Sequence, residues 1–149
     1  MKKIHNIIAT VFGIGRIVIA PGTWGSLAGL ALCLALHGNV ILYLLVFAGL
    51  FAAGVVSAGR VEEETGEKDP SIVVIDELAC IFPVFLFVPM SIPGVIVGFI
   101  LYRIIDIVKP PPVKSLEKLK GGWGIMLDDL AAGIYTNIIL HILVFLNLF

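Results

Sequence analysis

Residues 40–59 read VILYLLVFAGLFAAGVVSAG, twenty consecutive residues without an acidic or basic side chain. The last twenty residues, 130–149, read LAAGIYTNIILHILVFLNLF and are almost as apolar. A helix needs about 20 apolar residues to cross a bilayer, so both stretches are long enough to do so. Neither stretch alternates apolar and polar residues as a half-buried strand does. The two stretches therefore predict long apolar helices and an all-α protein.

Three shorter apolar stretches, residues 24–36, 78–88 and 94–105, lie between the long ones. Short apolar helices can tilt, thin the bilayer locally, or stay buried without crossing it. Hydrophobic residues make up 59% of the chain, against about 45–50% in soluble domains. No linker or internal repeat divides the sequence. We therefore expect one domain, residues 1–149, that forms a compact bundle of membrane-associated or membrane-spanning helices.

Charged residues are confined to alternate connections between the apolar stretches. The connections at 37–39 and 89–93 carry no Lys, Arg, Asp or Glu, whereas segments 2–16, 60–77 and 103–129 carry all of these residues. If the helices cross the membrane alternately, the three charged segments lie on one side, which the positive-inside tendency makes the cytoplasm. The pattern predicts a polar active site at this aqueous face.

Two classes of protein are excluded by composition. A net charge of −1 offers no basic surface for nucleic acid, whose binding depends on phosphate neutralisation. Cys33 and Cys80 lie in apolar surroundings without a CxxC or Cys/His pattern, so neither a disulfide framework nor a zinc site is indicated.

The first polar motif is DPSIVVIDEL, residues 69–78. Asp69 followed by Pro70 is typical of a helix start, and a helix from there places Asp69 and Asp76 two turns apart on one face. Asp76 and Glu77 could be solvated residues at a membrane boundary. However, acids near membrane depth are costly and usually functional, and Mg²⁺ prefers carboxylate oxygens.

The second motif is GGWGIMLDDLAAG, residues 121–133, a glycine-rich turn that enters an apolar helix. We expect Asp128 and Asp129 in the first turn of this helix, where an Asp can simply cap the helix or complement its dipole. Two acidic pairs, each at the charged end of an apolar stretch, are explained better by one or two shared metal ions.

The third motif is YRIIDIVKPPP, residues 102–112. Arg103 and Asp106 lie three residues apart on one helical face, and a local salt bridge is the simplest interpretation. Alternatively, Arg103 and Lys109 bind a phosphate, for which both side chains are suited. Asp106 would then orient Arg103 or join the metal cluster.

The fourth motif is APGTWGSL, residues 20–27, a turn that leads into an apolar helix. Thr23 is a candidate N-cap for that helix. In the functional interpretation the helix N-terminus faces an anion, with the hydroxyls of Thr23 and Ser26 nearby. The motif is not a Walker loop, because the GxxxxGK[ST] pattern is missing.

Together these stretches resemble the phosphatidylglycerophosphatase A family, bacterial enzymes that dephosphorylate phosphatidylglycerol phosphate with Mg²⁺. The resemblance spans nearly the whole chain and rests on the order and spacing of the segments. The matching segments are 12–15 (FGIG), 20–26 (APGTWGS), Asp69 with 71–77 (SIVVIDE), 103–106 (RIID) with Lys109 and Pro110, and 121–129 (GGWGIMLDD) with Ala132 and Gly133.

The resemblance implies a phosphatase of phospholipid biosynthesis in the bacterial cytoplasmic (inner) membrane, with its active site facing the cytoplasm and a phospholipid as substrate. It implies Mg²⁺ as cofactor and leaves a homo-oligomer open. The expected metal ligands are Asp69, Asp76, Glu77, Asp128 and Asp129; the expected catalytic residues are Asp76, Glu77, Asp106, Asp128 and Asp129; the expected substrate-binding residues are Thr23, Ser26, Arg103 and Lys109.

Two positions depart from the family pattern. Cys80 stands where family members commonly have Gly, one helical turn beyond Asp76, and Pro111 stands where an aromatic residue is common. Neither change removes an expected ligand. The nucleophile, a water molecule or an aspartate, is left open.

Two alternatives come from other classes. Carboxylates beside membrane helices also mark ion pathways, so the chain could be a small transporter or channel subunit that binds a cation; such acids are expected at mid-membrane depth. A soluble helical domain that buries its apolar faces in an oligomer is the other alternative.

Overall fold

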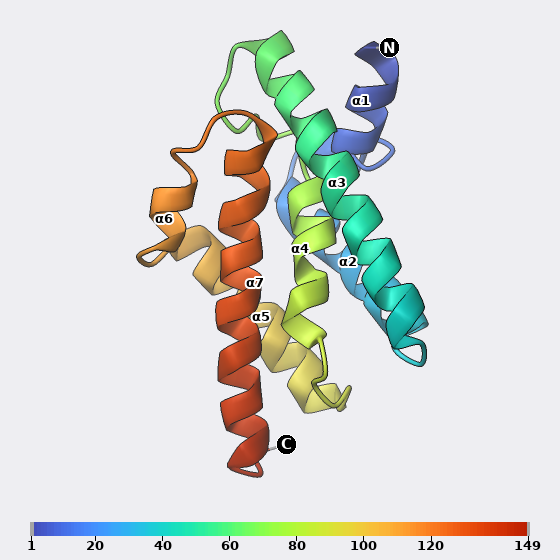
Figure 1. Ribbon diagram of the computed structural model, residues 1–149, viewed down its shortest axis with the longest axis vertical. Helices are drawn as coiled ribbons and strands as arrows, with labels where there is room; N and C mark the ends of the chain where they lie inside the picture. The colour runs from blue at the N-terminus through green and yellow to red at the C-terminus, as the bar shows by residue number, and fades with distance from the viewer. Residues whose placement is uncertain (1, 149) are drawn as a thin grey trace.

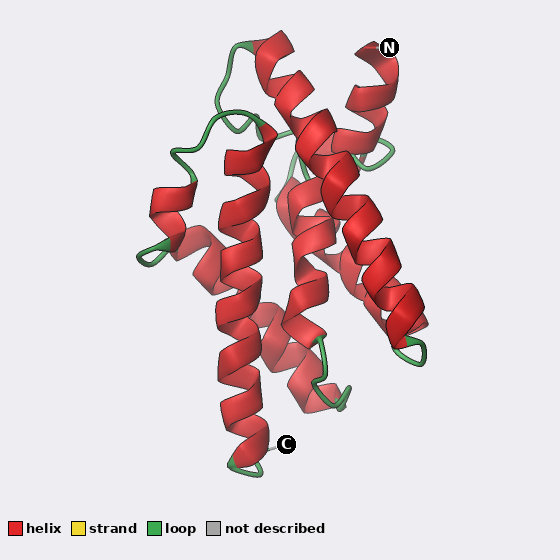
Figure 2. Ribbon diagram, in the orientation of Figure 1, coloured by secondary structure: helices red, strands yellow, loops and turns green. Residues whose placement is uncertain are grey.

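The computed structural model describes residues 2–148, and this part of the chain is all helical, without a strand (Figures 1 and 2). The prediction of an all-α bundle is confirmed. The helices are α1 (Lys2–Ala9), the 3₁₀ helix η1 (Ile14–Arg16), α2 (Pro21–Leu36), α3 (Val40–Thr65), α4 (Ile75–Phe85), α5 (Ile92–Val108), α6 (Val113–Leu116) and α7 (Gly122–Phe145).

Helices α3 and α7 come from the two long apolar stretches and are the two that are long and apolar enough to cross a membrane. Asn39 begins α3 by accepting a hydrogen bond from the Leu42 N–H at 3.0 Å, and Gly66, with φ 69°, ends it. Only 17% of the most apolar part of α3 and 33% of that of α7 are fully buried in the bundle, and both helices carry exposed large apolar side chains. An apolar surface of this kind suits a bilayer.

Helix α4 is the centre of the bundle. Nine of its 11 residues are buried, and it packs against α2, α3, α5 and α7. Glycines allow the closest approaches, because a Cβ at Gly29 on α2 or Gly133 on α7 would overlap backbone carbonyl oxygens of α4. The short apolar stretch at 78–88 therefore contributes a buried core helix, which is one of the alternatives expected for the short apolar stretches.

The predicted start of this helix at Asp69 and Pro70 is wrong. Helix α4 begins at Ile75, and Asp69 has a left-handed φ of 50°. The Val74 N–H donates to the Ala9 carbonyl at 2.9 Å, which fixes the preceding segment against the end of α1 instead of in a helix. Asp69 and Asp76 consequently do not share a helical face.

Two other predicted helix starts are displaced. The N-cap of α2 is Ala20, because Pro21 supplies a fixed φ at the first position, so Thr23 lies inside the first turn and does not cap it. Helix α7 begins at Gly122, so Asp128 and Asp129 lie in its second turn and not in its first. Capping therefore does not explain these two acids.

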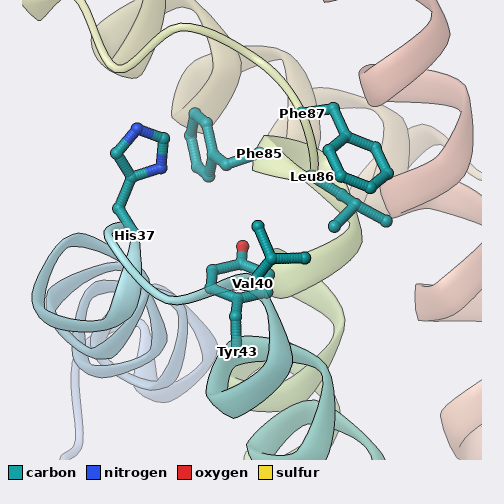
Figure 3. Close-up of a pocket in the computed structure, with 6 residues that line it drawn as sticks. All are labelled: His37, Val40, Tyr43, Phe85, Leu86 and Phe87. Carbon is teal, nitrogen blue, oxygen red and sulfur yellow. The ribbon is translucent and has the colours of Figure 1, made fainter.

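The connections are sorted by charge between the two ends of the bundle. Figure 1 shows the α3–α4 and α6–α7 connections near the N-terminus, and the uncharged α2–α3 and α4–α5 connections near the C-terminus. At the uncharged end a small pocket of about 90 Å³ opens (Figure 3). We call it the distal pocket; its lining residues are His37, Val40, Tyr43, Phe85, Leu86 and Phe87.

Candidate active site

A polar pocket of about 480 Å³ lies where the beginnings of α2 and α4 and the end of α5 meet α7. Side chains from segments more than 100 residues apart in the sequence converge here. We call it the polar pocket; it is lined by Ala20, Pro21, Gly22, Thr23, Asp69, Ser71, Val73, Asp76, Glu77, Arg103, Asp106, Ile107, Lys109 and Asp129.

Three of the predicted acids form one group in this pocket. Asp76 and Glu77 stand in the first turn of α4, and the packing of α4 against α7 brings Asp129 beside them. One carboxylate oxygen from each residue lies within 4.8 Å of the other two. We call this set the three-acid group.

The three-acid group fits a divalent cation. Three carboxylates this close, those of Asp76 and Asp129 buried and that of Glu77 half-buried, repel one another when they are ionised. Oδ1 of Asp76 and Oε2 of Glu77 are also buried without a hydrogen-bond partner among the described residues. Buried acceptors without donors are costly, and oxygen ligands of this kind are those that Mg²⁺ binds. The donor set is therefore suited to Mg²⁺.

Gly22, in the first turn of α2, lies directly against this group. A Cβ at this position would overlap Oε1 of Glu77 and come within 3.1 Å of Nη2 of Arg103. A residue without a side chain is thus needed for α2 to approach the acids. Gly22 belongs to the sequence motif at 20–27, but its role could not be deduced from the sequence because it depends on where α4 packs.

Arg103 is held at the edge of the three-acid group. Its Nη1 donates to Oδ2 of Asp106 at 2.9 Å and to the Ser26 hydroxyl at 3.2 Å, and lies 3.8 Å from Oε1 of Glu77. The local salt bridge is therefore present, and Asp106 orients Arg103. The Nε of Arg103 is buried without an acceptor among the described residues, which leaves a donor for a ligand.

The two predicted hydroxyl residues occupy different places. Thr23 lines the polar pocket. Ser26 is fully buried, donates to the Gly22 carbonyl at 2.9 Å and accepts from Arg103, so it supports the guanidinium from behind.

Lys109 and Asp128 form a short ion pair, with 2.6 Å between Nζ and Oδ2. Burial lowers the pKa of Lys109, but the hydrogen bond and charge of Asp128 outweigh it and raise this pKa above its usual value. Lys109 therefore stays charged. Asp128 does not belong to the three-acid group or to the pocket lining. The five predicted metal ligands are thus divided: Asp76, Glu77 and Asp129 form the three-acid group, whereas Asp69 and Asp128 lie outside it.

Asp69 lines the same pocket but does not belong to the three-acid group. Burial raises the pKa of its carboxyl group above the ordinary value, while the positive charge of Lys109 opposes this shift. A carboxyl group with a raised pKa can carry a proton nearer to neutral pH than an exposed one does.

Three of the seven non-glycine residues with a left-handed φ among the described residues line the polar pocket. Ala20, Asp69 and Lys109 line it with φ values of 50°, 50° and 46°, in the left-handed region that non-glycine residues rarely adopt. Such residues cost about 1–3 kcal/mol each and gather at functional sites, where the surrounding structure enforces them.

Tyr102 is a site residue to which the sequence alone assigned no role. It is fully buried, and its hydroxyl donates to Oδ2 of Asp129 at 3.1 Å. Its position four residues before Asp106 places it on the same helical face, which was the available signal. Cys80 is buried beside the site with its thiol 3.5 Å from the Met126 carbonyl, as a packing residue.

The fold and the pocket define a class: an all-helical protein with an apolar outer surface and a pocket in which carboxylate, guanidinium and ammonium groups come together. The model of one family, phosphatidylglycerophosphatase A, matches residues 7–144. The chain belongs to the phosphatidylglycerophosphatase A family.

Relatives agree with this assignment over most of the chain. A phosphatidylglycerophosphatase A of Haemophilus influenzae is 38% identical over 93% of this chain and 87% of its own length. One of Escherichia coli is 32% identical over 95% of this chain and 84% of its own. A Bacteroides thetaiotaomicron relative, provisionally named a phosphatidylinositol-3-phosphatase, is 38% identical over 91% of each chain. No solved structure matches the chain.

Proposed function

We propose that the chain hydrolyses the phosphate monoester of phosphatidylglycerol phosphate to phosphatidylglycerol and phosphate, with Mg²⁺, in phospholipid biosynthesis. The observation that carries the proposal is the three-acid group beside Arg103 and Lys109 in one pocket. The names of the Haemophilus influenzae and Escherichia coli relatives support the same substrate.

Asp76, Glu77 and Asp129 would hold the Mg²⁺. When bound, the cation would neutralise charge on the phosphate and stabilise the charge that develops during transfer. Asp69 and Asp128 remain predicted ligands, but the geometry favours the three-acid group.

The remaining side chains bind and orient the phosphate. Arg103 would donate from its free Nε to a phosphate oxygen, while Asp106 and Ser26 hold the guanidinium in place. Lys109, kept charged by Asp128, would supply a second positive charge. These contacts position the phosphorus atom next to the three-acid group, and fixed orientation of this kind is a major part of phosphoryl-transfer catalysis.

Hydrolysis breaks the bond between phosphorus and the glycerol oxygen, and the leaving oxygen must take up a proton. Asp69 is suited to deliver it, because burial raises its pKa and it lines the pocket outside the three-acid group. The nucleophile is a water molecule or an aspartate; both are compatible with this arrangement.

The proposed setting is the bacterial inner membrane. Helices α3 and α7 would lie in the bilayer, and the end that carries the charged connections would face the cytoplasm. The acyl chains of the substrate would stay among the apolar helices while its phosphate enters the polar pocket.

The transporter alternative is less well supported by the position of the acids. Asp76 and Glu77 stand in the first turn of α4, and Asp129 is seven residues from the beginning of the 24-residue α7. The group therefore lies toward the charged end of the bundle, whereas an ion pathway is expected to place acids near mid-depth.

The test is phosphate release from phosphatidylglycerol phosphate in mixed micelles, with and without Mg²⁺. The intact protein should release phosphate in the presence of Mg²⁺, and Asp129→Ala should lose this activity. Glu63→Ala is the control, because Glu63 is an exposed acid paired with Arg60 outside the polar pocket. Circular dichroism of each variant checks that it folds.

Phosphatidylinositol 3-phosphate is the comparison substrate, in view of the Bacteroides thetaiotaomicron relative. A higher kcat/KM for this lipid than for phosphatidylglycerol phosphate would show that phosphatidylinositol 3-phosphate is the preferred substrate. Absence of release from either lipid by folded protein, over several divalent metals, would contradict the phosphatase proposal and favour the transporter alternative.

A further inference from the structure

The polar pocket lies between two helices whose backbones make few contacts with each other. Helices α2 and α5 both pack on α4, yet they make few contacts with one another, and the pocket lies between the beginning of α2 and the end of α5. Figure 1 shows both helices on the far side of α4 from the viewer. The pocket therefore lies between the beginning of α2 and the end of α5, and the Arg103 side chain, which donates to Ser26, crosses between the two helices.

The pocket is recessed from the charged end of the bundle. Asp129, which lines it, is seven residues past the start of α7, a distance of roughly 10 Å at 1.5 Å per residue. A lipid phosphate that stays at its own depth in the bilayer can reach such a pocket from the side, without its acyl chains leaving the apolar surroundings.

Exposed apolar side chains belong to or adjoin the segments that line the pocket. Val18 and Ile19, just before α2, are 96% and 78% exposed, and Ile107, which lines the pocket from α5, is 72% exposed. Exposed apolar groups beside a charged pocket are unfavourable in water but match a ligand that has both a phosphate and hydrocarbon chains.

From Ile107 an exposed row of isoleucines continues down α5. Its members are spaced by three or four residues, which places them on one helical face. We call the row the isoleucine stripe: Ile96, Ile100, Ile104 and Ile107.

We propose that the isoleucine stripe of α5 is the docking surface for the acyl chains of the phospholipid substrate, which enters the polar pocket sideways between α2 and α5. The proposal rests on the proposed function and adds how the lipid is held. Charge complementarity fixes the direction: the phosphate meets Arg103 and Lys109 at the upper end of the stripe, and the chains follow the isoleucines away from the charged end.

Helix α7 provides a matched control surface. Ile134, Ile138 and Ile142 form a similar exposed row on α7, but none of them lines the polar pocket. General contact with bilayer lipid would make the two rows equivalent. Binding of the substrate chains would distinguish them.

The experiment compares two double variants, Ile100→Gln/Ile104→Gln on α5 and Ile134→Gln/Ile138→Gln on α7, reconstituted in phosphatidylcholine vesicles. Each is assayed with dioleoyl phosphatidylglycerol phosphate in the vesicles and with the dihexanoyl lipid supplied as a monomer. The α5 variant should lose about tenfold in kcat/KM for the dioleoyl lipid and less than about twofold for the dihexanoyl lipid, since fewer methylene groups contact the stripe. The α7 variant should keep both values.

Equal losses on the two substrates would overturn the proposal, because the stripe would then act through the fold. If the α7 variant loses as much activity as the α5 variant, the proposal is overturned as well, because any lipid-facing surface would then have the same effect. If the α5 variant does not fold, Ile100→Ala/Ile104→Ala gives the same comparison with a smaller loss. Failure of the intact protein on both lipids would instead contradict the proposed function itself.

Discussion

The polar pocket and the distal pocket lie at opposite ends of one core and satisfy their polar groups in opposite ways. In the distal pocket the Tyr43 hydroxyl donates to the Phe82 carbonyl at 2.7 Å, so its hydrogen bond is complete within the protein. In the polar pocket, buried oxygens of Asp76 and Glu77 have no donor among residues 2–148. The comparison teaches that unsatisfied buried polar atoms, more than a cavity alone, indicate where a ligand binds.

The largest expected effect comes from changing the charge of the three-acid group. Asp76→Asn should lower Mg²⁺-dependent phosphatase activity more than about 100-fold, the upper range for groups that only support metal ligands. The same variant should have a higher thermal midpoint without Mg²⁺, because it relieves repulsion among buried carboxylates. Thermal unfolding with and without Mg²⁺, together with phosphate release, measures both effects.

His37→Ala is the matched change at the distal pocket. His37 lines that pocket but makes no ion pair among the described residues. Neither activity nor the effect of Mg²⁺ on the thermal midpoint should change. A midpoint of Asp76→Asn that is lower without Mg²⁺ would contradict the electrostatic interpretation of the three-acid group.

A smaller but specific effect is expected from added bulk. Gly22→Ala should lower activity by about tenfold to 100-fold, because the new Cβ overlaps Glu77 and must displace it. Gly38→Ala is the control at the uncharged end, where a Cβ meets nothing within 4 Å. The kcat, KM and Mg²⁺ dependence of both variants separate displaced catalytic geometry from general damage; equal losses in both would reject the proposed contact.

The sequence predicted the long helices and the acidic pairs because these depend on local properties, namely apolar length and adjacent charges. The predicted helix start at Asp69 was wrong because Val74, in the segment that follows, donates a hydrogen bond to Ala9, more than 60 residues away. The division of the acids also depends on tertiary packing: α5 brings Lys109 to Asp128 and Tyr102 to Asp129. No local pattern contains these distances.

Tyr102→Phe should lower activity by about tenfold, the range for residues that orient metal ligands. The variant removes the hydroxyl that donates to Asp129 and leaves the buried ring in place. If Tyr102 acts by positioning Asp129, the Mg²⁺ concentration for half-maximal activity should rise. An unchanged Mg²⁺ requirement with lower kcat would show that the hydroxyl serves the reaction in another way.

The smallest effect is expected from the same change at the other end of the molecule, Tyr43→Phe. The lost hydrogen bond to the Phe82 carbonyl should lower the free energy of unfolding by about 1 kcal/mol. Activity and Mg²⁺ dependence should stay unchanged. Tyr43 contacts α4 near its end, whereas Asp76 and Glu77 stand in the first turn of that helix. Unfolding in mixed micelles with increasing dodecyl sulfate measures the first quantity. If Tyr43→Phe instead shifts the Mg²⁺ requirement as Tyr102→Phe does, α4 transmits changes along its whole length, and the two pockets are parts of one coupled site.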